Sequence, residues 1–346
     1  MTAQRVICDT IADMPDTLLP LIIPAPKSFN LSATARFFRF SDAEIVDTLD
    51  GGRYRRLFQL SSFSSATSLH LVTVETAKAT SNTASLRNAP GLSLTFLPEA
   101  DDRARNHAAQ IVASMFSTRH DLRGFRRLTK QDAVLGAVER AHRGLHLPRY
   151  ASLFEALTVS ILLQQIATAV AVVLKRRFVE RFGERIEVEG QYFFAFPSPE
   201  RIAGAEHTEL RSLGLSGAKA QSILDLARFM LSAPAFADEL AAEDNETIIE
   251  RLSTLRGVGR WTAEWALMLY FGRTDVFPAG DLALRAIASK YYSGGGQFTE
   301  SALRRFALER WGVWASYACI YLFAGLRAGL LTLERQRIAR VLSSSS

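Results

Sequence analysis

An isolated carboxylate, Asp281, stands directly before a stretch of helix-forming residues, 282–285. Aspartate is favoured at a helix N-cap, so the local pattern by itself favours a structural role. A carboxylate at a binding site can also stabilise positive charge that develops on a substrate, and it can orient or deprotonate a water molecule. The two roles are compatible. Asp275, six residues earlier, is the competing carboxylate, and we interpret it as a structural hydrogen-bonding residue.

A glycine-containing turn, residues 255–259, precedes the helix-forming run 261–271, and Gly272 is placed to end that helix. Glycine lets the backbone take a positive φ or approach another molecule closely. The first N–H groups of a helix have no intrahelical partner and lie at the positive end of its dipole, so they suit an anion such as phosphate. We call the start of this helix, residues 258–260, the phosphate grip. A phosphate grip and a lone carboxylate, joined by one aromatic helix, indicate chemistry on a nucleic acid.

The stretch 255–285 resembles the helix-hairpin-helix and Gly/Pro-loop-Asp signature of a DNA glycosylase superfamily, and it is most similar to the 3-methyladenine DNA glycosylase II (AlkA-type) branch. The match comprises the hairpin L-R-G-V-G-R-W-T-A, the lead-in D-V-F-P, and an aspartate twenty residues beyond Trp261. A bare G-V-G would be weak evidence, whereas the hairpin followed by the aspartate at this spacing is specific. The resemblance covers residues 115–328 well and the N-terminal part poorly.

The resemblance implies a monofunctional DNA glycosylase that flips alkylated purines of the 3-methyladenine type out of double-stranded DNA. It would hydrolyse the N-glycosidic bond of the damaged base, as base excision repair requires. In relatives that also cut the DNA strand, the position of Trp261 is a lysine that forms a Schiff base. Here the helix opens Arg260-Trp261-Thr262, and no lysine occurs between Lys219 and Lys290. Because arginine cannot act as an amine nucleophile, no lyase activity is expected.

The resemblance also assigns roles around the damaged nucleotide. Asp281 would stabilise the positive charge that develops on the sugar and would orient or deprotonate the attacking water. Trp261, Trp265 and Phe323 would hold the flipped base, because alkylated bases are electron-poor and often cationic and are attracted to aromatic faces. Leu269 continues the face of the two tryptophans at helical spacing, and we interpret it as a core residue.

Further roles concern the DNA duplex. Gln165 would act as the wedge, the residue that fills the gap left by a flipped base, with Gln164 as the alternative. Lys219 follows a looser helix–glycine–helix echo at 210–217 and is a candidate phosphate contact. The hairpin's own DNA contacts are expected from Gly257, Val258, Gly259, Arg260 and Thr262. A monovalent cation in the hairpin would take the backbone carbonyls of Ser253, Leu255 and Val258.

Other functions stay open at this point. One is a glycosylase for oxidised or deaminated bases that also has lyase activity, and the tryptophan at position 261 argues against it. Another is a damaged-DNA-binding protein without catalysis, or a scaffold in a repair assembly. Asp281 at its full spacing from the hairpin argues against the damage sensor, whereas a scaffold would be recognised by a loss of DNA affinity without base release.

The bulk properties are those of a globular protein: 346 residues, 48% hydrophobic and 22% charged, with a net charge of +6 that favours acidic partners. The two cysteines, Cys8 and Cys319, exclude a disulfide framework and the four-cysteine iron–sulfur cluster of some relatives. The apolar run 18–23 is too short for a signal peptide, and the run 314–333, interrupted by Arg327, is interpreted as a buried helix. We expect a cofactor-free monomer that binds no membrane and is intracellular, in the cytoplasm or nucleoid, or nuclear in a eukaryote.

The predicted fold class is α+β, an antiparallel sheet domain at 1–100 followed by an all-α glycosylase body at 101–330 and a tail at 331–346. Short alternating or β-branched runs separated by turn residues predict strands at 37–40, 54–60, 69–74 and 92–97, with a helix at 41–49. From residue 101 the period becomes helical. The hairpin occupies 250–272, and the other predicted helices are 104–116, 131–145, 158–182, 198–203, 206–213, 219–232, 244–253, 299–311 and 317–328.

Overall fold

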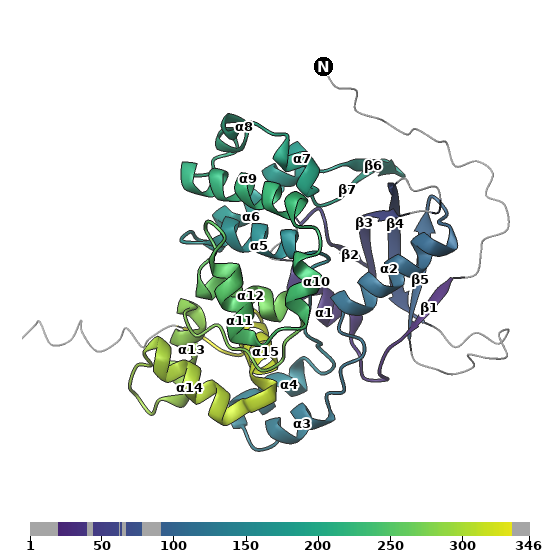
Figure 1. The fold of residues 1–346 in the computed structure, drawn as a ribbon. Helices are drawn as coiled ribbons and strands as arrows, with labels where there is room; N and C mark the ends of the chain where they lie inside the picture. Colours follow the sequence, from purple (N-terminus) through teal and green to yellow (C-terminus); the bar gives the residue numbers. More distant parts are fainter. Residues whose placement is uncertain (1–19, 40–43, 62, 64–66, 78–90, 334–346) are drawn as a thin grey trace, which may run out of the picture. The chain divides into compact units, whose positions relative to one another are not determined.

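The computed structural model describes residues 20–39, 44–61, 63, 67–77 and 91–333, and the chain forms two compact units (Figure 1). Unit 1 comprises the described residues of 1–121 and 144–272, and unit 2 comprises those of 122–143 and 273–346. The functional division at residues 100 and 330 stays a prediction. Most of the predicted tail, residues 334–346, lies outside the described residues, as does Cys8.

A five-stranded antiparallel sheet opens unit 1, with its strands in the order β1-β5-β4-β3-β2. In β5 the alternate residues Leu92, Leu94 and Phe96 are buried, because successive side chains of a strand point to opposite faces. They pack in one core with residues of helices α1 and α2. The strands are β1 Leu21–Pro24, β2 Thr48–Asp50, β3 Arg53–Ser61, β4 Thr67–Thr76 and β5 Gly91–Leu97. The predicted fold class is confirmed, as are the strands at 54–60, 69–74 and 92–97.

Two predictions at the N-terminal end were wrong. Of the run predicted as a strand, 37–40, residues 37 and 38 are instead the end of helix α1, Leu31–Phe38, whose start is capped by the Asn30 side chain. Residues 31, 35 and 38 lie on one face of this helix and are buried in the core, which satisfies a helical period. The predicted helix at 41–49 is absent from its described part, since 44–47 are not helical and Thr48–Asp50 pair with β3. Residues 40–43 lie outside the described residues.

The helical part of unit 1 begins with α2, Asp102–Met115, and continues after residue 144. The single helix predicted at 158–182 was wrong: α5 and α6 are separated by residues 164–167, where Gln165 has φ +55°. Helix α5 ends because its C-cap, Gln164, has an extended backbone at ψ 133°, and the left-handed Gln165 that follows cannot resume the right-handed helix. A hairpin, β6 Arg185–Val188 and β7 Gln191–Phe194, was not predicted. The helices are α5 Leu153–Leu163, α6 Thr168–Phe182, α7 Pro199–Ala203, α8 His207–Ser212, α9 Gly217–Ser232, α10 Phe236–Ala241, α11 Asn245–Ser253 and α12 Arg260–Leu269.

Unit 2 is helical in its described residues. Asp132 connects three of its segments, since its carboxylate caps α4 and accepts hydrogen bonds from the side chains of Tyr292, Arg310 and Trp311. Its helices are α3 Arg123–Thr129, α4 Ala133–Ala141, α13 Leu282–Tyr292, α14 Glu300–Trp311, the 3-10 turn Gly312–Trp314 and α15 Ala315–Arg327. In the described part of the chain, every helix is too short or too polar to cross a membrane.

Candidate active site and nucleic-acid interface

The predicted hairpin is present in unit 1 as α11, a turn at 254–259, and α12. The turn is closed by a hydrogen bond from the Val258 N–H to the Leu255 carbonyl at 3.0 Å, and Val258 itself is buried. The N-cap of α12 is Gly259, which has no side chain with which to cap the helix. The first intrahelical bond runs from the Ala263 N–H to the Gly259 carbonyl at 3.0 Å. The positive end of the α12 dipole is therefore left to backbone N–H groups, which is the arrangement that binds anions.

The two hairpin glycines do different things. Gly257 has φ +80°, and a Cβ built on it would lie 2.6 Å from the Ser222 hydroxyl on α9. The fold itself therefore requires glycine at position 257. Gly259 has an extended backbone that any residue adopts, with φ −104° and ψ 179°, and a Cβ there would meet no atom of the described residues within 4 Å. The space beside Gly259 is open, so glycine at this position suits the close approach of another molecule.

This difference predicts opposite effects of two alanine substitutions. Gly257→Ala should lower the free energy of unfolding by about 2 kcal/mol or more, from the disfavoured φ and the clash with Ser222. Gly259→Ala should cost at most about 1 kcal/mol, the preference for glycine over alanine at an N-cap, but should weaken duplex DNA binding about tenfold by obstructing a phosphate. Urea unfolding and fluorescence anisotropy measure the two quantities. Unchanged DNA affinity in Gly259→Ala would contradict a phosphate site at this turn.

The two glutamines lie in the break between α5 and α6 and differ in their surroundings. The Gln164 side-chain amide donates to the Gly257 carbonyl at 2.8 Å and to the Thr262 hydroxyl at 2.9 Å. It therefore fastens the end of α5 to the hairpin, and Thr262 is buried beneath it. Gln165 is exposed and has φ +55°. This arrangement favours Gln165 over Gln164 as the wedge, which stays a prediction.

Two predicted phosphate contacts have partners within the chain. The Lys219 ammonium donates to the carbonyls of Leu162 and Gln164, and burial lowers its pKa. The Arg260 guanidinium pairs with Glu246 of α11 and with the buried Glu264. A phosphate contact by the backbone N–H of Arg260 stays a prediction. An ammonium has three N–H donors, and the two carbonyls use only two of them. A phosphate contact by Lys219 is therefore compatible with the structure and stays a prediction.

The aromatic face of α12 carries Trp261 and Trp265. Both indoles are partly exposed, and their ring centroids lie 6.4 Å apart at an interplanar angle of 74°. The residues between them, 262–264, are buried. Leu269, the next residue on this face, is partly buried and packs against a core cluster that contains Tyr150 and Val159, in agreement with a packing role. The two tryptophans therefore combine a fixed edge-to-face geometry with accessible ring surface, which suits contact with a planar cation.

Asp281 belongs to unit 2 and is the N-cap of α13. Its Oδ1 accepts hydrogen bonds from the N–H groups of Ala283 at 2.9 Å and Leu284 at 3.1 Å. The structural role expected from the sequence is thus present, and the carboxylate is partly exposed. Asp275 is exposed at the beginning of the same loop. A carboxylate whose rotamer is fixed by two backbone N–H groups is held in one orientation, as a group that stabilises developing charge must be.

Ser316 on α15 fixes the loop that leads to Asp281, a role that was not predicted from the sequence. Its hydroxyl donates to the Val276 carbonyl at 2.7 Å and accepts from the Val276 N–H at 3.2 Å, while its own N–H donates to the Thr274 carbonyl at 2.9 Å. Its side chain is completely buried. Further along α15, residues 315–322 are buried and Phe323 is partly exposed; its role as a pocket aromatic stays a prediction.

Ser316→Ala should slow base release about ten- to a hundredfold, because the loop that carries Asp281 loses the two side-chain bonds that fix it. Affinity for the duplex should stay near the wild-type value, since the predicted phosphate grip belongs to unit 1. Single-turnover rates and the Kd on one duplex separate the two effects. Ser301→Ala, at an exposed serine of α14, is the control. A wild-type rate in Ser316→Ala would contradict the positioning role.

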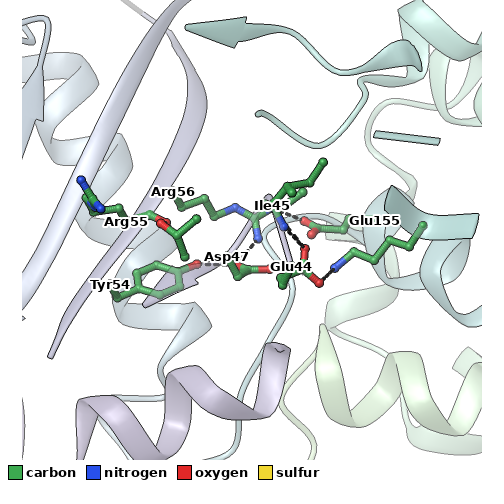
Figure 2. A network of polar contacts seen from close by, with 10 residues as sticks. Glu44, Ile45, Asp47, Tyr54, Arg55, Arg56 and Glu155 are labelled. Carbon is green, nitrogen blue, oxygen red and sulfur yellow. Dashed lines mark hydrogen bonds and ion pairs between the residues drawn. The ribbon is translucent and has the colours of Figure 1, made fainter. Parts of the chain in front are cut away.

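A buried ionic network supports α5, the helix that ends at Gln164 (Figure 2). Arg56 of β3 pairs with Asp47 at 2.8 Å and with Glu155 of α5 at 2.6 Å, and these three side chains are at most 3% exposed. Lys175 of α6 pairs with Glu44 at 2.8 Å. Burial would raise the pKa of Asp47, but Arg56 and Lys175 outweigh it and the pKa lies below its usual value. For Glu155, burial dominates over the attraction of Arg56 and raises the pKa.

The donor set proposed for a monovalent cation consists of backbone carbonyls in the hairpin turn. The Leu255 carbonyl accepts the Val258 N–H at 3.0 Å, and its second lone pair can face a cation. Carbonyl oxygens are suitable ligands for hard cations. The chemistry of Ser253, Leu255 and Val258 therefore fits such an ion, whose presence stays a prediction.

The curated proteins most useful for comparison are similar to this chain in sequence and are named DNA-3-methyladenine glycosylases. The chain is 31% identical over 219 residues to a DNA-3-methyladenine glycosylase of Bacillus subtilis, an alignment that covers 63% of this chain and 72% of the relative. It is 31% identical over 192 residues to the DNA-3-methyladenine glycosylase 2 of Escherichia coli, covering 56% of this chain and 64% of that protein. The aligned segment thus spans only about two thirds of each curated relative.

Similarity in fold is more extensive. A 3-methyladenine DNA-glycosylase from Archaeoglobus fulgidus matches 89% of this chain and 98% of its own, with a TM-score of 0.75 and 26% identity. An 8-oxoguanine glycosylase/lyase of Clostridium acetobutylicum shares the fold with a TM-score of 0.66 at 15% identity. The HhH-GPD superfamily of base excision DNA repair proteins matches residues 158–312, which include the hairpin, Gln164, Gln165 and Asp281. The chain belongs to this superfamily and, within it, to the 3-methyladenine DNA glycosylase family.

Proposed function

We propose that this protein is a monofunctional DNA glycosylase that excises alkylated purines of the 3-methyladenine type from double-stranded DNA. The observation that carries the proposal is the hairpin turn, where Gly259 leaves open space at the uncapped start of α12, followed at the family's spacing by Asp281 at the start of α13. The curated relatives named above support the class of substrate. We further propose that it acts as a monomer.

Separate residues are proposed to bind the DNA phosphate, to fill the base stack and to hold the flipped base. Backbone N–H groups at Gly259 and Arg260 bind a DNA phosphate, which positions the duplex without reading its sequence. Gln165 fills the stack when the damaged nucleotide leaves it, and the unstacking cost of a few kcal/mol is smallest for damaged pairs. The accessible faces of Trp261 and Trp265 attract the cationic base, and Phe323 adds a third aromatic ring.

Asp281 acts on the sugar. As the N-glycosidic bond breaks, positive charge develops on the deoxyribose, and a carboxylate held by two N–H groups stabilises this charge. The same carboxylate orients a water and accepts its proton as the water oxygen bonds to the sugar carbon, while the bonding pair leaves with the cationic base and neutralises it. The products are the free base and an abasic site. The reaction requires no amine from the protein, in agreement with tryptophan at position 261.

A duplex oligonucleotide with one hypoxanthine or alkylated adenine tests the proposal. After incubation with the protein, half of the sample is treated with hot alkali, and the other half is treated with borohydride. Strand cleavage only after alkali, with no protein–DNA adduct in borohydride, is expected for a monofunctional enzyme. Cleavage without alkali, or a trapped adduct, would show a lyase and favour the alternative of a bifunctional glycosylase. Binding without any abasic site would favour a non-catalytic damage sensor.

A further inference from the structure

The break between α5 and α6 is fastened from two sides. We call residues 164–167 the wedge loop. On one side, the Lys219 ammonium donates to the Leu162 carbonyl at 2.9 Å and to the Gln164 carbonyl at 2.7 Å. The Leu162 carbonyl lies in the last turn of α5, where carbonyls lack intrahelical partners and face the negative end of the helix dipole, so a cation there is doubly favoured. The Gln164 carbonyl belongs to the wedge loop itself. Lys219 stands on the first turn of α9, and the Ser216 hydroxyl caps that helix by accepting the Lys219 N–H.

On the other side, the wedge loop is bound to the DNA-binding hairpin. The Gln164 amide donates at once to the Gly257 carbonyl at 2.8 Å and to the Thr262 hydroxyl at 2.9 Å. One residue of the loop therefore connects the hairpin turn and the first turn of α12 with the end of α5. The hairpin turn also packs on α9 at Ser222, so α5, α9 and α12 meet around this loop.

Between these fastenings, Gln165 takes a conformation that its own chemistry disfavours. Its φ is +55°, in the left-handed region where a Cβ clashes with the backbone. A strained residue of this kind persists only when its surroundings determine its conformation, and such residues cluster at functional sites. Gln165 itself is exposed, so the determining contacts are those of its neighbours.

We propose that Lys219 and Gln164 are positioning residues that hold Gln165 ready to enter the duplex and that couple this wedge to the phosphate grip. The inference rests on the proposed function and gives Lys219 a different role from a phosphate contact. Because the wedge loop is already ordered in the free protein, binding does not have to pay the entropy of ordering it. The fixed loop therefore raises the affinity for DNA in which Gln165 fills the gap left by a base. Without the ammonium, the two carbonyls lose their partner and Gln165 is released from its strained conformation.

A double-mutant cycle on Lys219 and Gln165 tests this. The variants are Lys219→Met, which keeps the length of the side chain without its charge, Lys219→Arg, Gln165→Ala, and the combination of Lys219→Met with Gln165→Ala. The quantity measured is the preference for a duplex with a stable abasic analogue over an intact duplex of the same sequence, taken as a ratio of Kd values. The slope of log K against log salt concentration is measured for each variant, and circular dichroism confirms that each is folded.

Lys219→Met is expected to lower the preference for the abasic duplex about tenfold. Lys219→Arg should retain most of it. In the Gln165→Ala background the loss caused by Lys219→Met should nearly vanish, and the salt slope should stay the same in all variants. A fall of about one in the salt slope on loss of the lysine would overturn the inference, because that result marks a phosphate contact. Effects that add within about twofold would overturn it as well, since independent sites add.

The cycle is separable from the test of the proposed function. If the wild-type protein prefers the abasic duplex but releases no base, the glycosylase assignment fails and the positioning role stands on the cycle. If it releases damaged bases while the two substitutions are independent, only the positioning role fails. If the wild-type protein shows no preference for the abasic duplex, there is no gap-filling wedge and the inference is overturned. Gln164→Met, which removes both bonds to the hairpin, provides a second cycle should Lys219→Met not fold.

Discussion

Replacing Asp281 with asparagine should slow base release about 10²- to 10⁴-fold, the range expected when a charge-stabilising or acid–base group is lost. Stability and DNA affinity should remain close to the wild-type values. Asparagine is as good an N-cap as aspartate, so its oxygen can accept the Ala283 and Leu284 N–H groups that Asp281 accepts. The substitution therefore removes the negative charge and keeps the local structure. Single-turnover kinetics on a lesion-bearing duplex measure the effect.

Two control variants separate charge from structure. Asp281→Ala removes the cap as well, so it should lose about 1 kcal/mol of stability in addition to activity. Asp275→Asn changes the neighbouring exposed carboxylate of the same loop and should leave the rate of base release within about twofold of the wild type. If Asp275→Asn abolished activity and Asp281→Asn did not, the assignment of the two carboxylates would have to be exchanged.

Arg56→Met should produce the largest loss of stability, about 3–5 kcal/mol, because it leaves the buried carboxylates of Asp47 and Glu155 without their cation. The network joins β3 to the first turn of α5, so the substitution affects both the sheet and the helix that ends at the wedge loop (Figure 2). Salt should change this loss little, since screening by ions is weak for buried pairs. Urea unfolding monitored by circular dichroism measures the free energy.

Arg55→Met is the matched control, because the neighbouring arginine of the same strand is only partly buried. Its guanidinium lies over the Phe193 ring at 4.8 Å and makes one long hydrogen bond to Gln191. A loss of no more than about 1 kcal/mol is expected, the usual limit for an exposed contact. Equal losses in the free energy of unfolding for the two variants would show that the buried ion pairs of Arg56 stabilise the fold no more than the contacts of Arg55.

The local parts of the site were predictable from the sequence because their signals are local. The glycine turn, the helix that follows and the N-cap position of Asp281 all depend on a few consecutive residues, and each is present in the structure. The echo at 210–217 is also a helix–glycine–helix turn, with Gly214 at φ +100° in place of Gly257 at φ +80°. In the N-terminal part the residues gave no specific match, yet the fold similarity extends over 89% of the chain.

The break at the wedge loop could not be predicted, because its causes lie far away in the sequence. Residues 158–182 have a continuous helical pattern, and no glycine or proline marks an interruption. The structure shows that the chain is held open there by Lys219, on α9, and by the hairpin carbonyl of Gly257. Tertiary hydrogen bonds of this kind override local helix propensity.

The buried charges were unpredictable for the same reason. Arg56 lies in an alternating strand pattern that gives no sign of a buried cation, and its partner Glu155 is 99 residues away. Only a structure shows that the two meet. The clamp formed by Ser316 on Val276 is likewise a contact between segments 40 residues apart, and a serine in an apolar helix has no sequence signal that distinguishes it.

Hydrolysis of the bond between a damaged purine and its sugar is the activity proposed for this chain. The most direct measurement is chromatographic identification of the free bases that the wild-type protein releases from methylated duplex DNA. We expect release of free 3-methyladenine together with an equal number of abasic sites, and intact strands until alkali is added. If the wild-type protein binds this DNA but releases no free base, and Asp281→Asn behaves in the same way, the proposed hydrolysis is contradicted.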